Sequence, residues 1–286
     1  MLKAFKSRMK WRTVNWGRML SHRLGPPLEK DLQLIAETLR QDGIAICDVR
    51  LLLGDEVSLF DAVREETLDR RRSDMAHERA AELSGEKNFK VKLFDRDVDF
   101  ERPLVRISLH PRVLALANHY MGMRSYLRVI DLWWDRPTTD PAAATQLWHR
   151  DFDDARCIKA FIYLNDVDAD TGPFTYMPGT HMFGELADVV PGDGSKNRFS
   201  DAEMATAFDM QKAKIVTGQA GTVIFCDTYG FHRGVKPHKD RLMSSFQYVS
   251  RASKYPRDFH LSGAPAQLDI VQRQALEAFP AGGMHN

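Results

Sequence analysis

The chain has 286 residues, 43% of them hydrophobic, and its formal net charge at pH 7 is +1. This composition is typical of a globular protein with a sizeable core, and the balanced charge gives no reason to expect a nucleic acid as partner. No apolar run reaches the roughly 18 residues of a membrane-spanning helix, and three cysteines without CxxC spacing favour a reducing, cytoplasmic setting.

Residues 1–27 form a basic arm without an acidic residue. Its apolar residues Phe5, Met9, Trp16 and Leu20 fall close to one face of a helix. We expect the arm to pack on its own domain or on a second subunit. The alternatives are peripheral association with an anionic membrane surface and an organellar transit peptide. The basic residues are Lys3, Lys6, Arg8, Lys10, Arg12, Arg18 and Arg23.

Residues 28–121 show mainly helical patterns. Apolar residues at helical spacing predict helices over 28–41, 55–72 and 111–121, the last of them closed by Gly122. A short strand is expected over 44–47. The highly charged stretch 70–88 is expected to be a solvated helix or a loop.

From Ser125 onward, short β-branched and aromatic runs alternate with turn residues. They predict strands over 126–134, 158–164, 174–177, 222–226 and 242–250, with helices over 201–210 and 265–279. Helices followed by many short strands are typical of a mainly β protein with helical support, of the jelly-roll type. We therefore expect one domain over 28–286, with its jelly-roll core at about 125–250.

One residue separates His149 from Asp151, so in a strand both side chains lie on the same face. Alone this pair is a weak signal, but His232 follows another apolar strand at a similar position. Two histidines and one carboxylate can hold iron(II) on one octahedral face, which leaves three positions for a 2-oxo acid and dioxygen. Arg241, at the start of the next strand, offers a guanidinium fork to the far carboxylate of the 2-oxo acid.

The sequence resembles the phytanoyl-CoA dioxygenase family of iron(II)/2-oxoglutarate-dependent oxygenases, most clearly from Trp148 onward. The segments that carry the resemblance are "WHRD" (148–151), "KAFIYLNDVDADTGPFTYMPGTH" (159–181) and "GTVIFCDTYGFHRG" (221–234), together with Arg241. The resemblance implies a double-stranded β-helix, with His149, Asp151 and His232 as iron ligands and Arg241 as the 2-oxoglutarate anchor. Gly234 stands where some relatives have a hydroxyl.

Other residues near this centre are candidates for contacts with small molecules. We expect Tyr163 to hydrogen-bond 2-oxoglutarate, and alternation from Arg241 places Met243, Ser245 and Gln247 on the same inward face. The candidate substrate contacts are Trp133, Trp148, Asp153, Asp154 and Arg156. A core position is the alternative for Trp133, and a solvated loop for the three charged residues.

The sequence thus predicts an iron(II)/2-oxoglutarate-dependent dioxygenase that uses O2 to hydroxylate a C–H bond and releases succinate and CO2. The substrate is expected to be a small metabolite, or one linked to a lipid or a sugar. The alternative is a metal-binding β-barrel without oxygenase activity, namely an isomerase, a sensor or a scaffold. The sequence leaves the oligomeric state open.

Overall fold

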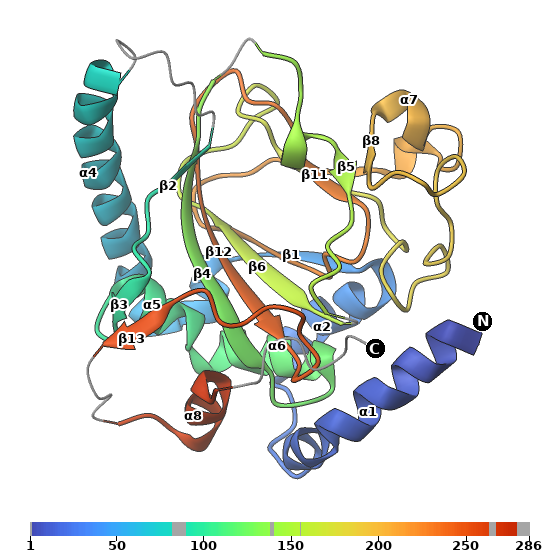
Figure 1. Ribbon diagram of the computed structural model, residues 1–286. Coiled ribbons are helices and arrows are strands. Elements are labelled where there is room, and N and C mark those ends of the chain that lie inside the picture. The colour runs from blue at the N-terminus through green and yellow to red at the C-terminus, as the bar shows by residue number, and fades with distance from the viewer. Residues whose placement is uncertain (1, 82–89, 138–139, 155, 263–266, 279–286) are drawn as a thin grey trace.

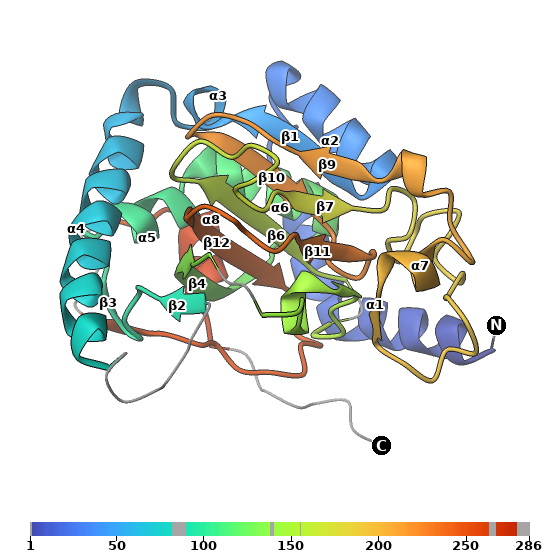
Figure 2. The same ribbon diagram turned by 90° about the horizontal axis from the view of Figure 1, so that it is seen from above.

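Two antiparallel sheets face each other in the computed structural model, which describes residues 2–81, 90–137, 140–154, 156–262 and 267–278 (Figures 1 and 2). The large sheet has the strand order β1-β10-β6-β12-β4-β2, and the small sheet has the order β8-β5-β11-β7-β9. Every neighbouring pair in the two sheets is antiparallel. Two such facing sheets form a jelly roll, so the predicted fold class is confirmed.

The strands are short, as expected. The large sheet contains β1 (Ile44–Asp48), β2 (Lys90–Lys92), β4 (Tyr126–Asp135), β6 (Ile158–Tyr163), β10 (Thr222–Cys226) and β12 (Arg241–Val249). The small sheet contains β5 (Trp148–His149), β7 (Phe174–Tyr176), β8 (Arg198–Phe199), β9 (Lys214–Val216) and β11 (His232–Gly234). A separate parallel pair joins β3 (Asp97–Asp99) to β13 (His260–Ser262).

Helices cover the outer face of the large sheet, where α2, α5, α6 and α8 contact its strands (Figure 1). The α-helices are α1 (Leu2–Arg23), α2 (Lys30–Asp42), α3 (Val49–Leu53), α4 (Ser58–Ala81), α5 (Pro103–Ser108), α6 (Pro111–Met121), α7 (Asp201–Met204) and α8 (Ile270–Leu276). Short 3-10 turns occur at η1 (Gly54–Glu56), η3 (Ala144–Gln146) and η4 (Met210–Lys212). Within the described part of the chain, no helix is both long and apolar enough to cross a membrane.

Capping residues explain where the helices begin and end. Gly43 closes α2 with φ 79° and Gly122 closes α6 with φ 64°, the left-handed conformation that glycine adopts without strain. The predicted helix over 201–210 was too long, because the chain leaves the helix after Met204 to bury Phe208. The C-terminal helix begins only at Ile270, where Asp269 caps it by accepting from the N–H of Gln272.

Alternation along β12 decides what faces the space between the sheets. Leu242, Phe246 and Tyr248 belong to the core beneath the helices, whereas Arg241 and Gln247 lie on the opposite, inward face. Met243 and Ser245 share that inward face, as the sequence predicted.

The described part of the basic arm packs against its own domain through α1. Trp11 is 7% exposed within the main core. Arg18 donates to the carbonyl of Arg124 and lies over the ring of Tyr126. Trp16, by contrast, is 64% exposed. Leu20 is 45% exposed, so neither Trp16 nor Leu20 of the predicted apolar face packs tightly on the domain. The side chains of Phe5 and Met9 lie outside the described part of the chain.

Candidate metal centre

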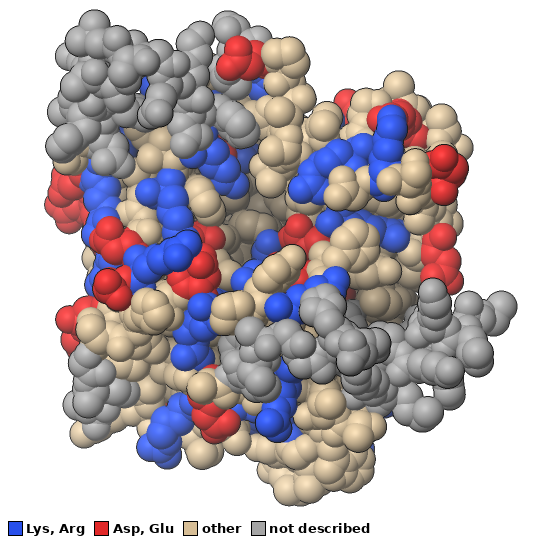
Figure 3. Space-filling model, in the orientation of Figure 1, with Lys and Arg blue, Asp and Glu red and all other residues tan. Residues whose placement is uncertain are grey.

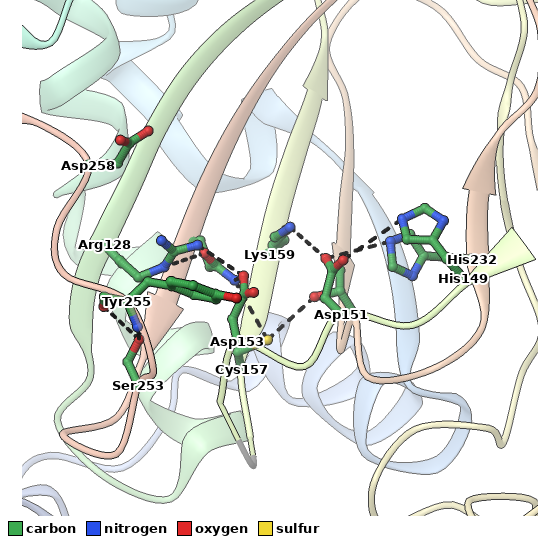
Figure 4. A network of polar contacts seen from close by, with 12 residues as sticks. Arg128, His149, Asp151, Asp153, Cys157, Lys159, His232, Ser253, Tyr255 and Asp258 are labelled. Atoms are coloured by element: carbon green, nitrogen blue, oxygen red, sulfur yellow. Dashed lines mark hydrogen bonds and ion pairs between the residues drawn. The ribbon is translucent and has the colours of Figure 1, made fainter. Parts of the chain in front are cut away.

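His149 on β5 and His232 on β11 are direct partners in the ladder of the small sheet, with ring centroids 4.2 Å apart. The N–H of Asp151 donates to the carbonyl of Thr228 at 2.8 Å, which holds the segment after β5 beside β11. The Asp151 carboxylate lies 3.8 Å from Nε2 of His149 and 3.7 Å from Nε2 of His232 (Figure 4). Ligand atoms of the three residues all lie within 4.8 Å of one another, so the group could hold a metal ion.

Backbone contacts set the orientation of both imidazoles. Nδ1 of His149 lies 2.9 Å from the carbonyl of Leu147, and Nδ1 of His232 lies 2.9 Å from that of Gly230. A carbonyl can only accept, so each Nδ1 carries the proton and each Nε2 keeps a free lone pair toward Asp151.

The charges of the three side chains also suit a divalent metal. Burial lowers the pKa of His149 to about 3 and lowers the pKa of His232 as well. Burial alone would raise the pKa of Asp151, but Lys159 and the two histidines outweigh it and hold this pKa below its usual range. At neutral pH the group is therefore two neutral imidazoles and one carboxylate, a donor set that fits iron(II).

The three side chains open into a cavity of about 490 Å³ between the sheets. Figure 3 shows the hollow near the centre of the face seen in Figure 1, with acidic and basic side chains around it. Inward residues of β4, β6 and β12 form its wall, and residues 255–258 also line it. The charged side chains of the wall include Lys90, Arg128, Asp131, Lys159, Arg241 and Asp258.

Arg241 lies in this wall and is itself buried. Its Nε and Nη2 donate to Oδ2 of Asp135 at 3.1 and 2.8 Å, and its Nη1 donates to the carbonyl of Gly172. A Cβ on Gly234 would lie 2.7 Å from Nη2 of Arg241, so the guanidinium occupies the space that a side chain at position 234 would need.

Lys90 lines the same cavity and lies 4.4 Å over the ring of Trp133. Burial lowers the pKa of Lys90, and nearby Arg241 and Lys159 lower it further, against the opposite effect of Asp135. Positive charge therefore gathers around this region of the wall.

One of the predicted substrate contacts lines the cavity, and a second contacts residues that line it. Trp133 is part of its wall, whereas Trp134 points away and donates through Nε1 to Asp240. Asp153 accepts hydrogen bonds from Arg128 and Gln247, which both line the cavity. Their contact with a substrate stays a prediction.

The structure contradicts the contacts predicted for Trp148 and Tyr163. Trp148 is fully buried on the side opposite His149, and its Nε1 donates to Asp201. Tyr163 does face inward, but its hydroxyl donates to the carbonyl of Val216 and accepts from the N–H of Phe174. Neither side chain lines the cavity. Strand alternation turns Trp148 to the face opposite His149, and the two hydrogen bonds of Tyr163 hold its hydroxyl beneath β7 and β9.

Asp154 and Arg156 were also wrong as substrate contacts. Asp154 is buried and accepts from the N–H of Ser250. Arg156 donates to the carbonyl of Met121 at the end of α6 and lies over the ring of Tyr120. Both side chains hold the loop after β5 on the helical layer instead of reaching the cavity.

The sequence reasoning missed Lys159, Arg128 and Lys90. Lys159 donates to Oδ2 of Asp151 at 2.7 Å. The available signal for Lys159 was a lone charged residue at an inward position of the otherwise apolar strand "IKAFIY". For Arg128 the signal was weaker, because "YLRVIDLWWD" also contains Asp131 and Asp135. A charge in that position is rarely retained without a partner or a function.

Comparisons with known proteins agree with this architecture. Residues 40–236 match the family model described as Phytanoyl-CoA dioxygenase (PhyH). The ectoine dioxygenase of Stutzerimonas stutzeri (strain A1501) is 25% identical in an alignment 251 residues long, and the match covers 78% of this chain and 78% of that one.

Two solved structures share the fold. EctD from S. alaskensis with 2-oxoglutarate and 5-hydroxyectoine gives a TM-score of 0.52 at 16% identity, over 91% of this chain and 87% of that one. The epimerase SnoN in complex with Fe3+, alpha ketoglutarate and nogalamycin RO gives a TM-score of 0.50 at 19% identity, over 88% of this chain and 96% of that one. With the family match extending over most of the chain, the protein belongs to the phytanoyl-CoA dioxygenase family and is a non-haem iron, 2-oxoglutarate-dependent dioxygenase.

Proposed function

We propose that this dioxygenase hydroxylates a C–H bond of a small polar metabolite, at an iron(II) ion held by His149, Asp151 and His232. The supporting observation is the convergence of their ligand atoms within 4.8 Å, at a cavity of about 490 Å³. Bound iron(II) and 2-oxoglutarate supply the activation of dioxygen, whereby one oxygen atom enters the substrate, the other enters succinate, and CO2 is released.

Lys159 positions the carboxylate of this group. Its ammonium donates to Oδ2 of Asp151 at 2.7 Å from the opposite sheet. The hydrogen bond fixes the carboxylate plane and leaves Oδ1 for the metal. Contacts of this kind to a metal-binding carboxylate orient it and tune the metal.

Arg241 and Lys90 bind the 2-oxoglutarate dianion. Asp135 holds the guanidinium of Arg241 in one plane and compensates one positive charge. The carboxylates that act on Lys90, Lys159 and Arg241 are those of Asp131, Asp135 and Asp151. A bound divalent metal would add positive charge to this group, which a dianion would lower.

The size of the cavity supports a small substrate. About 490 Å³ must accommodate 2-oxoglutarate together with the part of the substrate that reacts. A lipid-linked or sugar-linked substrate would have to place its remaining part outside the cavity.

We place the enzyme in a reducing, cytoplasmic setting, which the free state of Cys47, Cys157 and Cys226 supports. Peripheral membrane association or self-association through α1 is a further proposal. Its support is the exposure of Trp16 and Leu20 on the side of α1 away from the domain, together with the basic charge of the arm.

Release of labelled CO2 from 2-oxoglutarate, with iron(II) and ascorbate present, tests the reaction. His149→Ala is expected to reduce the release by at least ~100-fold, because it removes a metal ligand. His238→Ala, at an exposed histidine outside the cavity, is the matched control. Undiminished release by His149→Ala would overturn the assignment of the iron site.

A further inference from the structure

A β-bulge in β4 brings an additional charged side chain into the cavity. Along the pairing with β12, Gln247 is opposite Val129 and Tyr248 is opposite Leu127, so Arg128 has no partner in the ladder. Leu127 and Ile130 both point into the core beneath the helices, while Arg128 and Val129 both line the cavity. A regular strand would have turned one of these two side chains away, and bulges commonly redirect a side chain in this manner.

Arg128 is held in a closed set of three hydrogen bonds (Figure 4). Its Nε donates to Oε1 of Gln247 at 2.7 Å and its Nη2 donates to Oδ2 of Asp153 at 2.9 Å. Nε2 of Gln247 donates to the same oxygen of Asp153 at 2.9 Å. Among the described residues no hydrogen bond uses Nη1 of Arg128 or Oδ1 of Asp153, so within that part of the chain the pair retains one donor group and one acceptor atom.

This pair lies close enough to the candidate metal centre to bind a substrate there. Lys159, Gln247 and Val129 are ladder partners in one row across β6, β12 and β4. Two strand spacings correspond to about 10 Å, and Lys159 itself contacts Asp151. Arg241 lies six residues from Gln247 on the same face of β12, or about 20 Å away. A molecule at Arg128 and a molecule at Arg241 can therefore be bound together.

The charges of the cavity wall then restrict what binds at Arg128. Lys159 is paired with Asp151, Arg241 with Asp135, and Arg128 with Asp153. Arg257, which also lines the wall, donates instead to the carbonyls of Ala275 and Glu277 at the end of α8, where the helix dipole is negative. Asp131 is paired with Lys92, and Asp258 with Lys92 and Arg96. Positive and negative charges near Arg128 therefore largely balance, and buried net charge on a ligand would be left uncompensated.

We propose, on the basis of the function proposed above, that the substrate is a small zwitterion whose carboxylate is bound by Arg128 and whose cationic nitrogen is bound by Asp153. Gln247 hydrogen-bonds both Arg128 and Asp153 and so fixes the position of one side chain relative to the other. A zwitterion brings a negative group to Arg128 and a positive group to Asp153, so both of its charges are compensated. A simple anion would bring no positive group to Asp153, and a simple cation would bring no negative group to Arg128. The Trp133 ring in the same wall suits the apolar part of such a molecule.

The first test is succinate formation with a panel of free, cyclic and N-methylated amino acids, each with its methyl ester and its N-acetyl acid. We expect at least one zwitterion to raise turnover about tenfold or more over the rate without substrate, and its two singly charged derivatives to give less than about a tenth of that effect. Equal stimulation by either derivative overturns the proposal. So does stimulation by sugars or polyols when no zwitterion in the panel acts.

The second test uses substitutions that invert the preference, which misfolding cannot imitate. Arg128→Gln should favour the methyl ester over the zwitterion, and Asp153→Asn should favour the N-acetyl acid. In each variant the KM for the zwitterion should rise about tenfold or more, with a much smaller change in the KM for 2-oxoglutarate. The matched controls are Arg72→Gln and Asp69→Asn, which remove an exposed ion pair on α4. Unchanged preference in both cavity variants overturns the proposal.

Ligand binding distinguishes failure of this inference from failure of the proposed function. The thermal shift of the iron-loaded protein with the same panel reports binding without turnover. Stabilisation by a zwitterion that Arg128→Gln abolishes, in a protein that never turns over 2-oxoglutarate, supports the binding site and refutes the hydroxylase. Turnover of 2-oxoglutarate that only non-zwitterions stimulate would support the hydroxylase and refute the proposed zwitterion site.

Discussion

The ammonium of Lys159 lies 2.7 Å from Oδ2 of Asp151, and this contact joins β6 of the large sheet to the segment that follows β5 of the small sheet. Burial would lower the pKa of Lys159, but the carboxylates of Asp151 and Asp153 outweigh burial and raise it. The candidate metal centre is therefore assembled across both sheets. Its geometry depends on a lysine that is not itself one of the three candidate ligands.

Removing this lysine is expected to weaken metal binding. In Lys159→Met the Asp151 carboxylate loses the hydrogen bond that orients it, so the affinity for iron(II) should fall by about 10–100-fold. Anaerobic metal titration measures the change. Lys239→Met, which removes an exposed lysine paired with Asp168, is the matched control. Equal affinities in the two variants would show that Asp151 is oriented without Lys159.

The stability of the metal-free protein should fall with acidification below about pH 6.5. The pKa of His149 is lowered to about 3 by burial, so between these two values the unfolded chain binds a proton that the folded protein excludes. The unfolding free energy therefore decreases as the pH falls, by up to about 1.4 kcal/mol per pH unit for one such group. Because the pKa of Asp151 is also lowered in the folded protein, the unfolding free energy decreases further as the pH falls below about 4.

Urea unfolding at several pH values measures this slope. His149→Gln should reduce the slope by about one proton, whereas His238→Gln, at an exposed position, serves as the control. A slope that persists in full in His149→Gln would place the proton uptake at another group.

Arg241 and Asp135 are expected to affect different properties. Arg241→Lys keeps one charge but loses the planar fork, so the KM for 2-oxoglutarate should rise by about tenfold or more. Asp135→Asn leaves a buried guanidinium without its carboxylate, which should cost about 3–5 kcal/mol of unfolding free energy. Steady-state kinetics and denaturant unfolding separate the two effects. An unchanged KM in Arg241→Lys would exclude Arg241 as the anchor.

Gly234 is expected to be needed for the position of the Arg241 guanidinium. In Gly234→Ala the new Cβ would lie 2.7 Å from Nη2, so the flexible end of the arginine must shift and the KM for 2-oxoglutarate should rise. Gly17→Ala, where no atom lies within 4 Å of the added Cβ, is the control. It should stabilise α1 by about 0.5–1 kcal/mol and leave kinetics unchanged.

The two tryptophans of α1 should differ in their effect on stability. Trp11→Ala empties a position that is 7% exposed and should cost about 3–5 kcal/mol. Trp16→Ala alters a side chain that is 64% exposed and should change stability by less than about 0.5 kcal/mol. Co-sedimentation with anionic vesicles then tests the proposed surface contact, since Trp16→Ala should reduce it. Equal vesicle binding by the wild-type protein and the Trp16→Ala variant would contradict that contact.

Local rules account for much of the fold. Gly122 ends its helix where the sequence indicated, and Gly43 ends α2 close to the predicted boundary at 41, because both glycines adopt the left-handed conformation at the helix terminus. Alternation also predicted which residues of β12 face inward. The same rule, applied to Trp148 beside His149, would have excluded that tryptophan from the cavity.

The sequence by itself determined the fold class, the reaction class and the three residues proposed to hold iron, because strand periodicity and motif order are local properties of the chain. Only the tertiary structure decided the contents of the cavity. Arg128 enters it through a register shift between β4 and β12, and Lys159 meets Asp151 across two sheets. Contacts between strands far apart in the chain leave no periodic trace in either segment. For that reason the sequence did not reveal Arg128 or Lys159, although it did predict Asp153 as a substrate contact.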